Sequence, residues 1–389
     1  TEIRKQFPGF TWIAIDCPSG VDCETGEVSS GTVKADLTIC LEAVKQGELS
    51  YDAFPFCNEF VTVELGLSAY SERENPDVVV DENLIKALLP SRPELSHKGK
   101  FGKVLVIGGS TFYPGAPVLA GKGAYAVGAG LVQVAVPGSI FTVAAAANPE
   151  LTWLILEDAG GIISDIAVNT VRMNLQKTNS LVLGPGIGRE EVTRRFISEF
   201  LFGEVSHSTK GVGFLGVEKE SKLEESDFPN SPIVIDADGL FLLAKEKDWV
   251  EKLKRDAVLT PHPGEMASLS GISVEEIQKE RIEIARKYAQ EWKQVVVLKG
   301  ALTVVADATG RVAVIPIATS SLAKGGTGDV LAGMIGGMLA QGLDTRSAAV
   351  VAAWLHARAG IMASKRLGAD ESVLASDVVK YLPKVYKAI

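Results

Sequence analysis

The residues best suited to chemistry lie in the segment Lys324-Gly-Gly-Thr-Gly-Asp329, which opens a predicted helix. Small residues leave backbone N–H groups free at a helix start, and such groups bind phosphate. Asp329, in the first turn, could accept a proton from a substrate hydroxyl that attacks a phosphoryl group. A plain helix cap, with Thr327 or Asp329 bonded to the first amides, explains the segment equally well. The sequence contains no Gly-x-x-x-x-Gly-Lys-Ser/Thr pattern, which excludes a P-loop.

Three further motifs place glycine, histidine or lysine directly after predicted strands. Gly184-Pro-Gly-Ile-Gly188 could let a ligand approach the backbone, and a tight strand–helix turn explains it about as well. His262 lies between two prolines, and a rigid turn that presents a histidine outward favours a ligand contact over an ordinary surface position. Lys299-Gly-Ala-Leu-Thr303 offers a cation and free amides, but alone it is only a lysine before a turn.

These motifs need a scaffold of strands that alternate with helices. From residue 78 onward, short apolar strands end in glycine or polar turns that lead into helices. Continuous apolar strands of this kind indicate a parallel sheet covered on both faces, and ligands bind at the carboxyl ends of such strands. The predicted strands cover residues 103–107, 130–136, 180–183, 232–235, 257–260 and 294–298, and a hairpin follows over 303–317.

The chain of 389 residues is long enough for two domains, and we place them at residues 1–71 and 72–389. The first domain has about three short strands and little helix, which is too little for a stable domain alone. Phe202–Pro229 interrupts the strand–helix alternation and is predicted to be an inserted loop or flap. The chain starts with Thr1 inside a sheet-like pattern, so we expect it to be a piece of a longer protein.

Charge and cysteine content exclude several classes of protein. The net charge of −9 without a basic cluster argues against nucleic acid and membrane partners. The most apolar stretch is broken by Pro137 and Pro149, so no membrane span is expected. The four cysteines lack the spacing of a zinc site or a disulfide framework, which predicts free thiols in a cytoplasmic protein.

Eight motifs in this order resemble the ADP/ATP-dependent NAD(P)H-hydrate dehydratase family of the ribokinase-like superfamily. The resemblance implies an α/β, three-layer ribokinase-like domain with a central, mostly parallel sheet. It also implies an enzyme that phosphorylates the C6 hydroxyl of the S epimer of hydrated NADH or NADPH and then eliminates phosphate. The motifs are Lys103-Val-Leu-Val-Ile-Gly-Gly-Ser110, Gly115-Ala116, Gly128-Ala-Gly-Leu131, Leu183-Gly-Pro-Gly-Ile-Gly188, Asp236-Ala-Asp238, Leu259-Thr-Pro-His-Pro-Gly-Glu265, Lys299-Gly300 and Gly325-Gly-Thr-Gly-Asp329.

The resemblance also assigns roles to individual residues. Asp329 is the expected base. The hydrate-binding positions would be Ala116, Gly186, His262 and Asp329. The nucleotide-binding positions would be Lys299, Gly300, Ala301, Leu302, Thr303 and Gly328. The nucleotide, ADP or ATP, implies Mg²⁺, and no carboxylate in the sequence identifies itself as a ligand of that ion.

Residues 1–71 resemble the C-terminal part of an NAD(P)H-hydrate epimerase, a Rossmann-like α/β domain. The matching segments are Ile15-Asp-Cys-Pro-Ser-Gly-Val-Asp22, Thr25-Gly26, Val33-Lys-Ala-Asp36, Lys45 and Val61-Thr-Val-Glu-Leu-Gly66. In that family the aspartate corresponding to Asp16 contacts the hydrate, and the serine corresponding to Ser19 binds K⁺. The phosphate loop and first strands of the family are missing, so epimerase activity is expected only when the missing part is present. We also expect the strands between residues 12 and 65 to have apolar residues on both faces and no helices to cover them.

Two alternatives remain open. A different ribokinase-like kinase, for example of a vitamin-precursor alcohol, would share the Gly-Thr-Gly-Asp turn but release a phosphorylated product. A non-catalytic nucleotide-binding protein would be expected to lack Asp329, which is present. The expected partners are a small-molecule substrate and further copies of the chain in a homo-oligomer.

Overall fold

The chain contains two compact units, residues 1–79 and 80–389. The computed structural model describes residues 2–66, 77–203 and 230–389. The boundary predicted at residue 71 and most of the predicted insertion Phe202–Pro229 lie outside these residues. None of the described helices is long and apolar enough to cross a membrane.

The first unit has a three-stranded parallel sheet in the order β1-β2-β3. The strands are β1 (Ile13–Ile15), β2 (Leu37–Leu41) and β3 (Glu59–Val63), and the helices are α1 (Glu2–Gln6), the 3₁₀ turn η1 (Gln46–Leu49) and α2 (Phe54–Cys57). One sheet face is covered, because Thr38 is buried and its hydroxyl donates to the Cys57 carbonyl of α2 at 2.7 Å. The expectation that no helix covers the strands is therefore wrong for this face. On the opposite face Ile13, Ile15 and Val61 are exposed, as expected.

The larger sheet has ten described strands in the order β4-β13-β12-β11-β10-β9-β8-β5-β6-β7, and all of them except the short edge strand β4 belong to the second unit. The pairings from β11 through β7 are parallel, and β12 runs antiparallel to β11 and β13. The predicted parallel sheet and its terminal hairpin are thus confirmed. The strands are β4 (Val78–Val79), β5 (Lys103–Ile107), β6 (Leu131–Pro137), β7 (Thr152–Leu156), β8 (Ser180–Leu183), β9 (Ile233–Ile235), β10 (Ala257–Leu259), β11 (Val295–Leu298), β12 (Val304–Ala306) and β13 (Val312–Val314).

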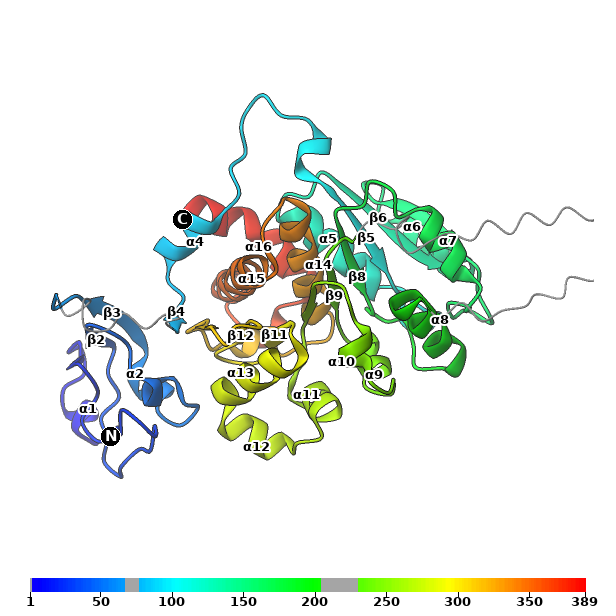
Figure 1. Ribbon diagram of the computed structural model, residues 1–389. Coiled ribbons are helices and arrows are strands. Elements are labelled where there is room, and N and C mark those ends of the chain that lie inside the picture. The colour runs from blue at the N-terminus through cyan, green and yellow to red at the C-terminus, as the bar shows by residue number, and fades with distance from the viewer. Residues whose placement is uncertain (1, 67–76, 204–229) are drawn as a thin grey trace, which may run out of the picture. The chain divides into compact units, whose positions relative to one another are not determined.

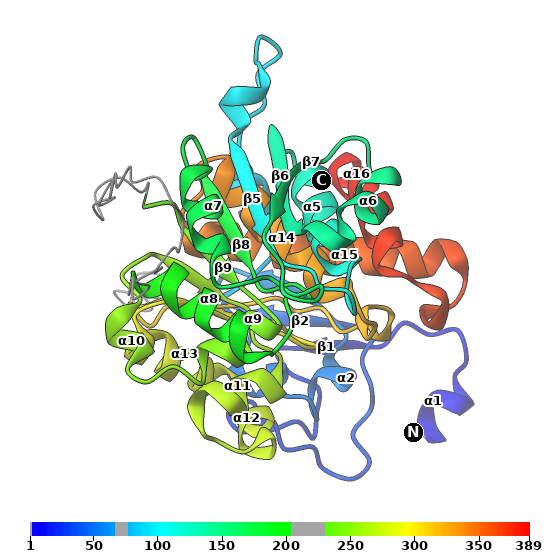
Figure 2. The ribbon, with the colours of Figure 1, turned by 90° about the vertical axis from the view of Figure 1, so that its right-hand side faces the viewer.

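Helices cover both faces of this sheet, as Figures 1 and 2 show. One layer contains α5 (Ala116–Ala126), α14 (Thr327–Ala340), α15 (Thr345–Leu367) and α16 (Ala375–Ala388). The other layer contains α8 (Glu191–Phe202), α9 (Asp238–Leu243), α10 (Trp249–Lys252), α11 (Pro263–Ser270), α12 (Val274–Lys279) and α13 (Arg281–Trp292), with α7 (Ala167–Met173) beside α8. The remaining helical segments are α4 (Glu82–Leu88), α6 (Gly138–Ala146), and the 3₁₀ turns η2 (Lys98–Phe101), η4 (Ser320–Leu322) and η5 (Asp370–Ser372).

Helices α5 and α14 approach each other closely through a line of small residues, which we call the glycine seam (Ala120, Gly123, Gly333 and Gly337). A Cβ atom at Gly333 would lie 1.8 Å from the Ala120 carbonyl oxygen, and one at Gly123 would lie 2.4 Å from that of Val330. Only glycine permits such contact between two helix backbones. The seam fixes where α14 begins, and α14 carries Asp329 in its first turn.

Candidate active site

A cavity of about 470 Å³ lies at the carboxyl ends of β9, β10 and β11 and at the start of α14. This is the edge of the sheet where the sequence predicts a ligand site. Its lining includes both polar motifs and apolar side chains: Asp236, Ala237, His262, Glu265, Lys299, Gly300, Ala301, Thr303, Ile315, Ile317, Thr319, Leu322, Ala323, Lys324, Gly325, Gly326, Thr327, Gly328, Asp329, Leu331, Ala353, His356 and Ala357.

The start of α14 is open toward a ligand because no side chain caps it. Gly326 occupies the N-cap position with a φ of +92°, a left-handed conformation that glycine adopts readily. The Thr327 hydroxyl donates instead to the carbonyls of Leu322 and Lys324, each at 2.8 Å. The alternative of a cap made by Thr327 or Asp329 is therefore wrong. The first amides of α14 form an anion site of the kind that phosphate occupies.

His356 in α15 holds this turn from the buried side, and the sequence reading did not include it. Its Nε2–H donates to the Thr327 carbonyl at 2.9 Å. Burial lowers the pKa of His356 to about 4, so the ring is neutral at neutral pH. The only sequence signal for this residue is a single histidine within an apolar, alanine-rich helix.

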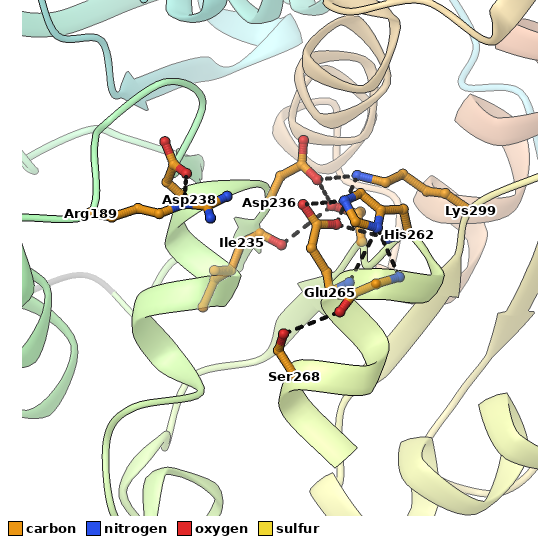
Figure 3. A network of polar contacts seen from close by, with 10 residues as sticks. Arg189, Ile235, Asp236, Asp238, His262, Glu265, Ser268 and Lys299 are labelled. Atoms are coloured by element: carbon orange, nitrogen blue, oxygen red, sulfur yellow. Dashed lines mark hydrogen bonds and ion pairs between the residues drawn. The ribbon is translucent and has the colours of Figure 1, made fainter. Parts of the chain in front are cut away.

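Beneath the same turn lies a network of charged side chains, shown in Figure 3. Asp236, 1% exposed, accepts hydrogen bonds through Oδ1 from the Lys299 ammonium at 2.6 Å and from the Thr260 hydroxyl at 2.7 Å. The Lys299 Nζ also lies 3.5 Å from Glu265 Oε2. The charges of Asp236 and Glu265 hold the pKa of Lys299 above its ordinary value, although burial acts in the opposite direction.

Asp329 shares this environment, which raises its pKa well above the ordinary value for an aspartate. Burial, followed by the negative charge of Asp236, raises the pKa of Asp329 to about 7, while Lys299 acts in the opposite direction. A general base works best when its pKa is near the working pH. Asp329 is therefore poised to accept a proton at neutral pH, beside an anion-binding helix start.

His262 is the N-cap of α11 as well as a cavity residue. Its Nδ1 accepts hydrogen bonds from the amides of Gly264 at 3.0 Å and Glu265 at 3.2 Å. The Glu265 carboxylate accepts the His262 amide at 2.8 Å, which completes a capping box. With Nδ1 as acceptor, a neutral ring carries its proton on Nε2, and that nitrogen lies 3.4 Å from Glu265 Oε1.

The predicted nucleotide positions fall into two groups. Lys299, Gly300, Ala301, Thr303 and Gly328 line the cavity. Leu302 does not line it, because its side chain is buried and its amide donates to the Ile317 carbonyl at 3.1 Å.

Two predicted hydrate positions, Ala116 and Gly186, lie together but outside the cavity lining. A Cβ atom at Gly186 would lie 2.9 Å from the Ala116 Cβ, so the two residues lie side by side. The same glycine turn reaches the Asp236-Ala-Asp238 segment, since the Gly188 amide donates to Asp238 at 3.2 Å and Arg189 pairs with Asp238 at 2.6 Å. The structure thus connects these positions to the cavity edge through Asp238, which the sequence reading quoted but gave no role.

In the first unit, Asp16 and Ser19 lie in the turn after β1. Asp16 has a φ of +68° and binds the Lys45 ammonium. That bond, with the Leu41 amide, lowers the pKa of Asp16 below its ordinary value. Ser19 is exposed and lines a shallow pocket of about 670 Å³ that extends over residues 12–15, 17–20 and 29–35.

Within the described residues, no three His, Cys, Asp or Glu side chains are arranged to hold a metal ion. At nucleotide sites Mg²⁺ is bound mainly by phosphates, water and one or two carboxylates.

Family models match both parts of the chain. The model described as NAD(P)H-hydrate dehydratase matches residues 104–384, and the one described as YjeF-related protein N-terminus matches residues 2–47. The chain is 32% identical over 375 residues to the bifunctional NAD(P)H-hydrate repair enzyme Nnr of Escherichia coli, covering 96% of this chain and 65% of that protein. It is 33% identical to the enzyme of the same name from Coxiella burnetii, covering 95% and 68%. The chain thus spans about two thirds of the length of these relatives.

Solved structures of dehydratases and other ribokinase-like proteins are also similar to this chain. The ADP/ATP-dependent NAD(P)H-hydrate dehydratase from Bacillus subtilis, co-crystallised with ATP and Mg²⁺, matches with a TM-score of 0.64 and 29% identity over 80% of this chain and 98% of that one. A ribokinase-like superfamily protein from Enterococcus faecalis matches with a TM-score of 0.63 and 22% identity over 80% and 95%, which shows the fold alone. The expected ribokinase-like fold is therefore confirmed. The chain belongs to the NAD(P)H-hydrate dehydratase family, and it carries at its front a segment of the YjeF-related N-terminal family.

Proposed function

We propose that the second unit dehydrates the S epimer of hydrated NADH and NADPH with ADP or ATP as phosphoryl donor. The observation that carries the proposal is the carboxyl group of Asp329, whose pKa is raised to about 7. It lies in the first turn of a helix that no side chain caps, and this turn borders a cavity. A base and an anion site at this spacing suit the transfer of a phosphoryl group to a hydroxyl.

In the proposed reaction, Asp329 accepts the proton of the hydrate C6 hydroxyl while that oxygen attacks the terminal phosphorus of the nucleotide. The bond from that phosphorus to the leaving nucleotide breaks, and the amides of Gly325–Gly328 stabilise the charge on the transferred group. Phosphate then leaves with its C–O electron pair, a proton is lost from the neighbouring ring carbon, and the double bond of the dihydropyridine forms. Mg²⁺, when bound with the nucleotide, would neutralise phosphate charge.

We divide the proposed site into a nucleotide side and a hydrate side. We assign the nucleotide to the turns Lys299–Thr303 and Gly325–Gly328, which both line the cavity. We assign the hydrate to the side of His262, Ala116 and Gly186, with the His262 Nε2–H as a donor. The Leu302 side chain would not contact the nucleotide, because it is buried, and its amide already donates to the Ile317 carbonyl.

The test is a chromatographic assay of purified hydrate epimers with Mg²⁺ and either ADP or ATP. We expect consumption of the S epimer, appearance of reduced cofactor absorbance, and release of one inorganic phosphate per turnover. A stable phosphorylated product of a vitamin-precursor alcohol, without hydrate turnover, would favour the alternative kinase. Running ADP and ATP side by side identifies the donor.

For the first unit, we propose that Asp16 contacts the hydrate and Ser19 binds K⁺. The exposed, strained turn that presents them supports this, because such backbone strain often occurs at binding sites. Interconversion of the two epimers in K⁺ and Na⁺ buffers tests it. We expect no epimerisation by these 389 residues alone, and K⁺-dependent epimerisation when the front third of an Nnr relative is supplied. We further propose a homo-oligomer, which sedimentation equilibrium tests.

A further inference from the structure

The Lys299 ammonium is held by protein carboxylates. It lies 2.6 Å from Asp236 Oδ1 and 3.5 Å from Glu265 Oε2, and its side chain is 17% exposed. A nucleotide phosphate could bind it directly only by competing with both of these groups. Removing one partner of a pair this buried leaves an uncompensated charge, which is unfavourable.

Further hydrogen bonds within the protein hold both members of the Lys299–Asp236 pair in place. Asp236 also accepts the buried Thr260 hydroxyl at 2.7 Å. The Lys299 amide donates a hydrogen bond to the Pro261 carbonyl at 2.9 Å. The Lys299 carbonyl accepts a hydrogen bond from the Arg281 guanidinium at 3.2 Å. Figure 3 shows that Lys299, Asp236 and Glu265 point toward one another from separate elements. The pair is therefore preorganised and does not depend on a ligand.

The pair lies directly under the start of α14. A Cβ atom at Gly328 would be 3.5 Å from the Lys299 Nζ and 3.9 Å from Asp236 Oδ2. Gly328 immediately precedes Asp329. The charged or titratable groups around Asp329 come from several elements: Asp236 after β9, Asp238 in α9, His262 at the N-cap of α11, Glu265 in α11, Lys299 after β11, Lys324 before α14 and His356 in α15. Of the two lysines in this set, Lys324 donates to the Glu371 carbonyl, and Lys299 faces the carboxylates.

We propose that Lys299 and Asp236 are positioning residues for Asp329, on which their fixed charges act in opposite directions, and that the Lys299 ammonium does not bind the nucleotide directly. This rests on the proposed function and deepens it. The opposite influences of the two residues on Asp329, Asp236 raising its pKa and Lys299 lowering it, support the assignment.

Because Lys299 and Asp236 have opposite charges, removing each should shift the pH dependence of activity in opposite directions. A merely structural role would not produce such opposite shifts. The activity of a carboxylate base rises with pH around its pKa. Lys299→Met removes the stabilising cation and should move the pH midpoint of kcat/KM for the hydrate upward by about 1 unit. Asp236→Asn removes a like charge and should move the midpoint downward. A purely structural defect would lower activity in both variants without opposite shifts.

Further variants keep the test decisive if a single change destabilises the protein. The double variant Asp236→Asn/Lys299→Met removes both charges and should return the midpoint toward that of the wild type. Lys299→Arg should keep it unchanged. Lys287→Met removes an exposed lysine that does not line the cavity and should not move the midpoint. The KM for nucleotide should change less than about threefold in Lys299→Met, whereas loss of a direct phosphate ion pair would raise it about tenfold or more.

The proposal is overturned if Lys299→Met raises the nucleotide KM strongly and leaves the midpoint in place, or if both single variants shift it in the same direction. A second readout separates this outcome from failure of the proposed function. The Asp329 carboxyl can be titrated without substrate by ¹³C NMR on aspartate-labelled protein, with Asp329→Asn used to assign the signal. If the enzyme did not act on the hydrate, that titration would still show whether Lys299 and Asp236 shift Asp329 in opposite directions.

Discussion

The two units each place an aspartate near a lysine at the carboxyl end of parallel strands, with opposite consequences. Asp16 binds Lys45 in a turn where its side chain is 42% exposed, and its pKa is lowered. Asp329 lies near Lys299, which is already bound to Asp236, and burial raises its pKa to about 7. A lysine neighbour therefore does not determine the protonation state of a carboxylate. The protonation state depends on how deeply the carboxylate is buried and on whether the lysine is already paired with another carboxylate.

The sheets explain the difference in burial. In the first unit, one sheet face is covered by α2 and the other exposes isoleucine and valine, so the turns at its edge are shallow. In the second unit, helices cover both faces of the sheet, and the start of α14 and part of α15 line the cavity at the strand ends. A site that must hold a half-protonated base at neutral pH requires the second kind of environment.

The largest contrast is expected from removing each aspartate. Asp329→Asn should reduce hydrate dehydration by about 10²- to 10⁴-fold, because the amide cannot take the hydroxyl proton. Nucleotide binding should largely survive, since the helix amides remain. Asp16→Asn should change dehydration less than about twofold. Steady-state assays and nucleotide titration measure both effects, and near-normal turnover by Asp329→Asn would remove the assignment of the base.

His262 can be tested separately from its capping role. His262→Ala should raise the KM for the hydrate about tenfold and cost the α11 cap about 1 kcal/mol. His262→Asn restores a good capping side chain but lacks the Nε2–H, so it should regain stability and keep the high KM. Equal KM values for His262→Asn and the wild type would show that the ring does not contact the hydrate.

Stability should depend on pH with opposite signs at the two aspartates. The folded-state pKa of Asp329 is raised from 3.8 to about 7, so the carboxyl favours folding at low pH and this contribution is lost as pH rises toward 7. Asp329→Asn should therefore raise the Tm more at about pH 8.5 than at about pH 5. The pKa of Asp16 is lowered, so its contribution is present above 3.8 and lost as pH falls. Asp16→Asn should destabilise the first unit at neutral pH and have little effect in acid.

The smallest effect concerns one buried threonine from each unit. Thr260 donates to the Asp236 carboxylate and Thr38 to the Cys57 carbonyl, both at 2.7 Å. Hydrogen bonds to charged groups are about twice as strong, so Thr260→Val should destabilise by about 2 kcal/mol and Thr38→Val by about 1 kcal/mol. Serine replacements keep the hydroxyl and serve as controls. Local hydrogen exchange near β10 and β2 measures each change, and equal effects would contradict the comparison.

The sequence predicts much of the second unit because its signals are local. Apolar strands followed by glycine turns define the parallel sheet, and the turns at Lys299, His262 and Gly325–Asp329 do line one cavity. Contacts between residues far apart in the chain could not be predicted. Asp236 and Lys299 are 63 positions apart, and His356 meets Thr327 across 29 positions. Leu302 illustrates a second limit, because a residue within a correct motif can point its side chain into the core.

The glycine seam between α5 and α14 has a consequence for how such an enzyme can diversify. Since a methyl group at Gly333 would collide with the Ala120 backbone, the position of Asp329 cannot be adjusted gradually by mutations along α14. New substrates would have to be accommodated by the loops around the cavity, while the helix pair stays unchanged. In a mutational library, we therefore expect tolerated and function-altering substitutions to concentrate in residues 315–324, and the seam to accept almost none.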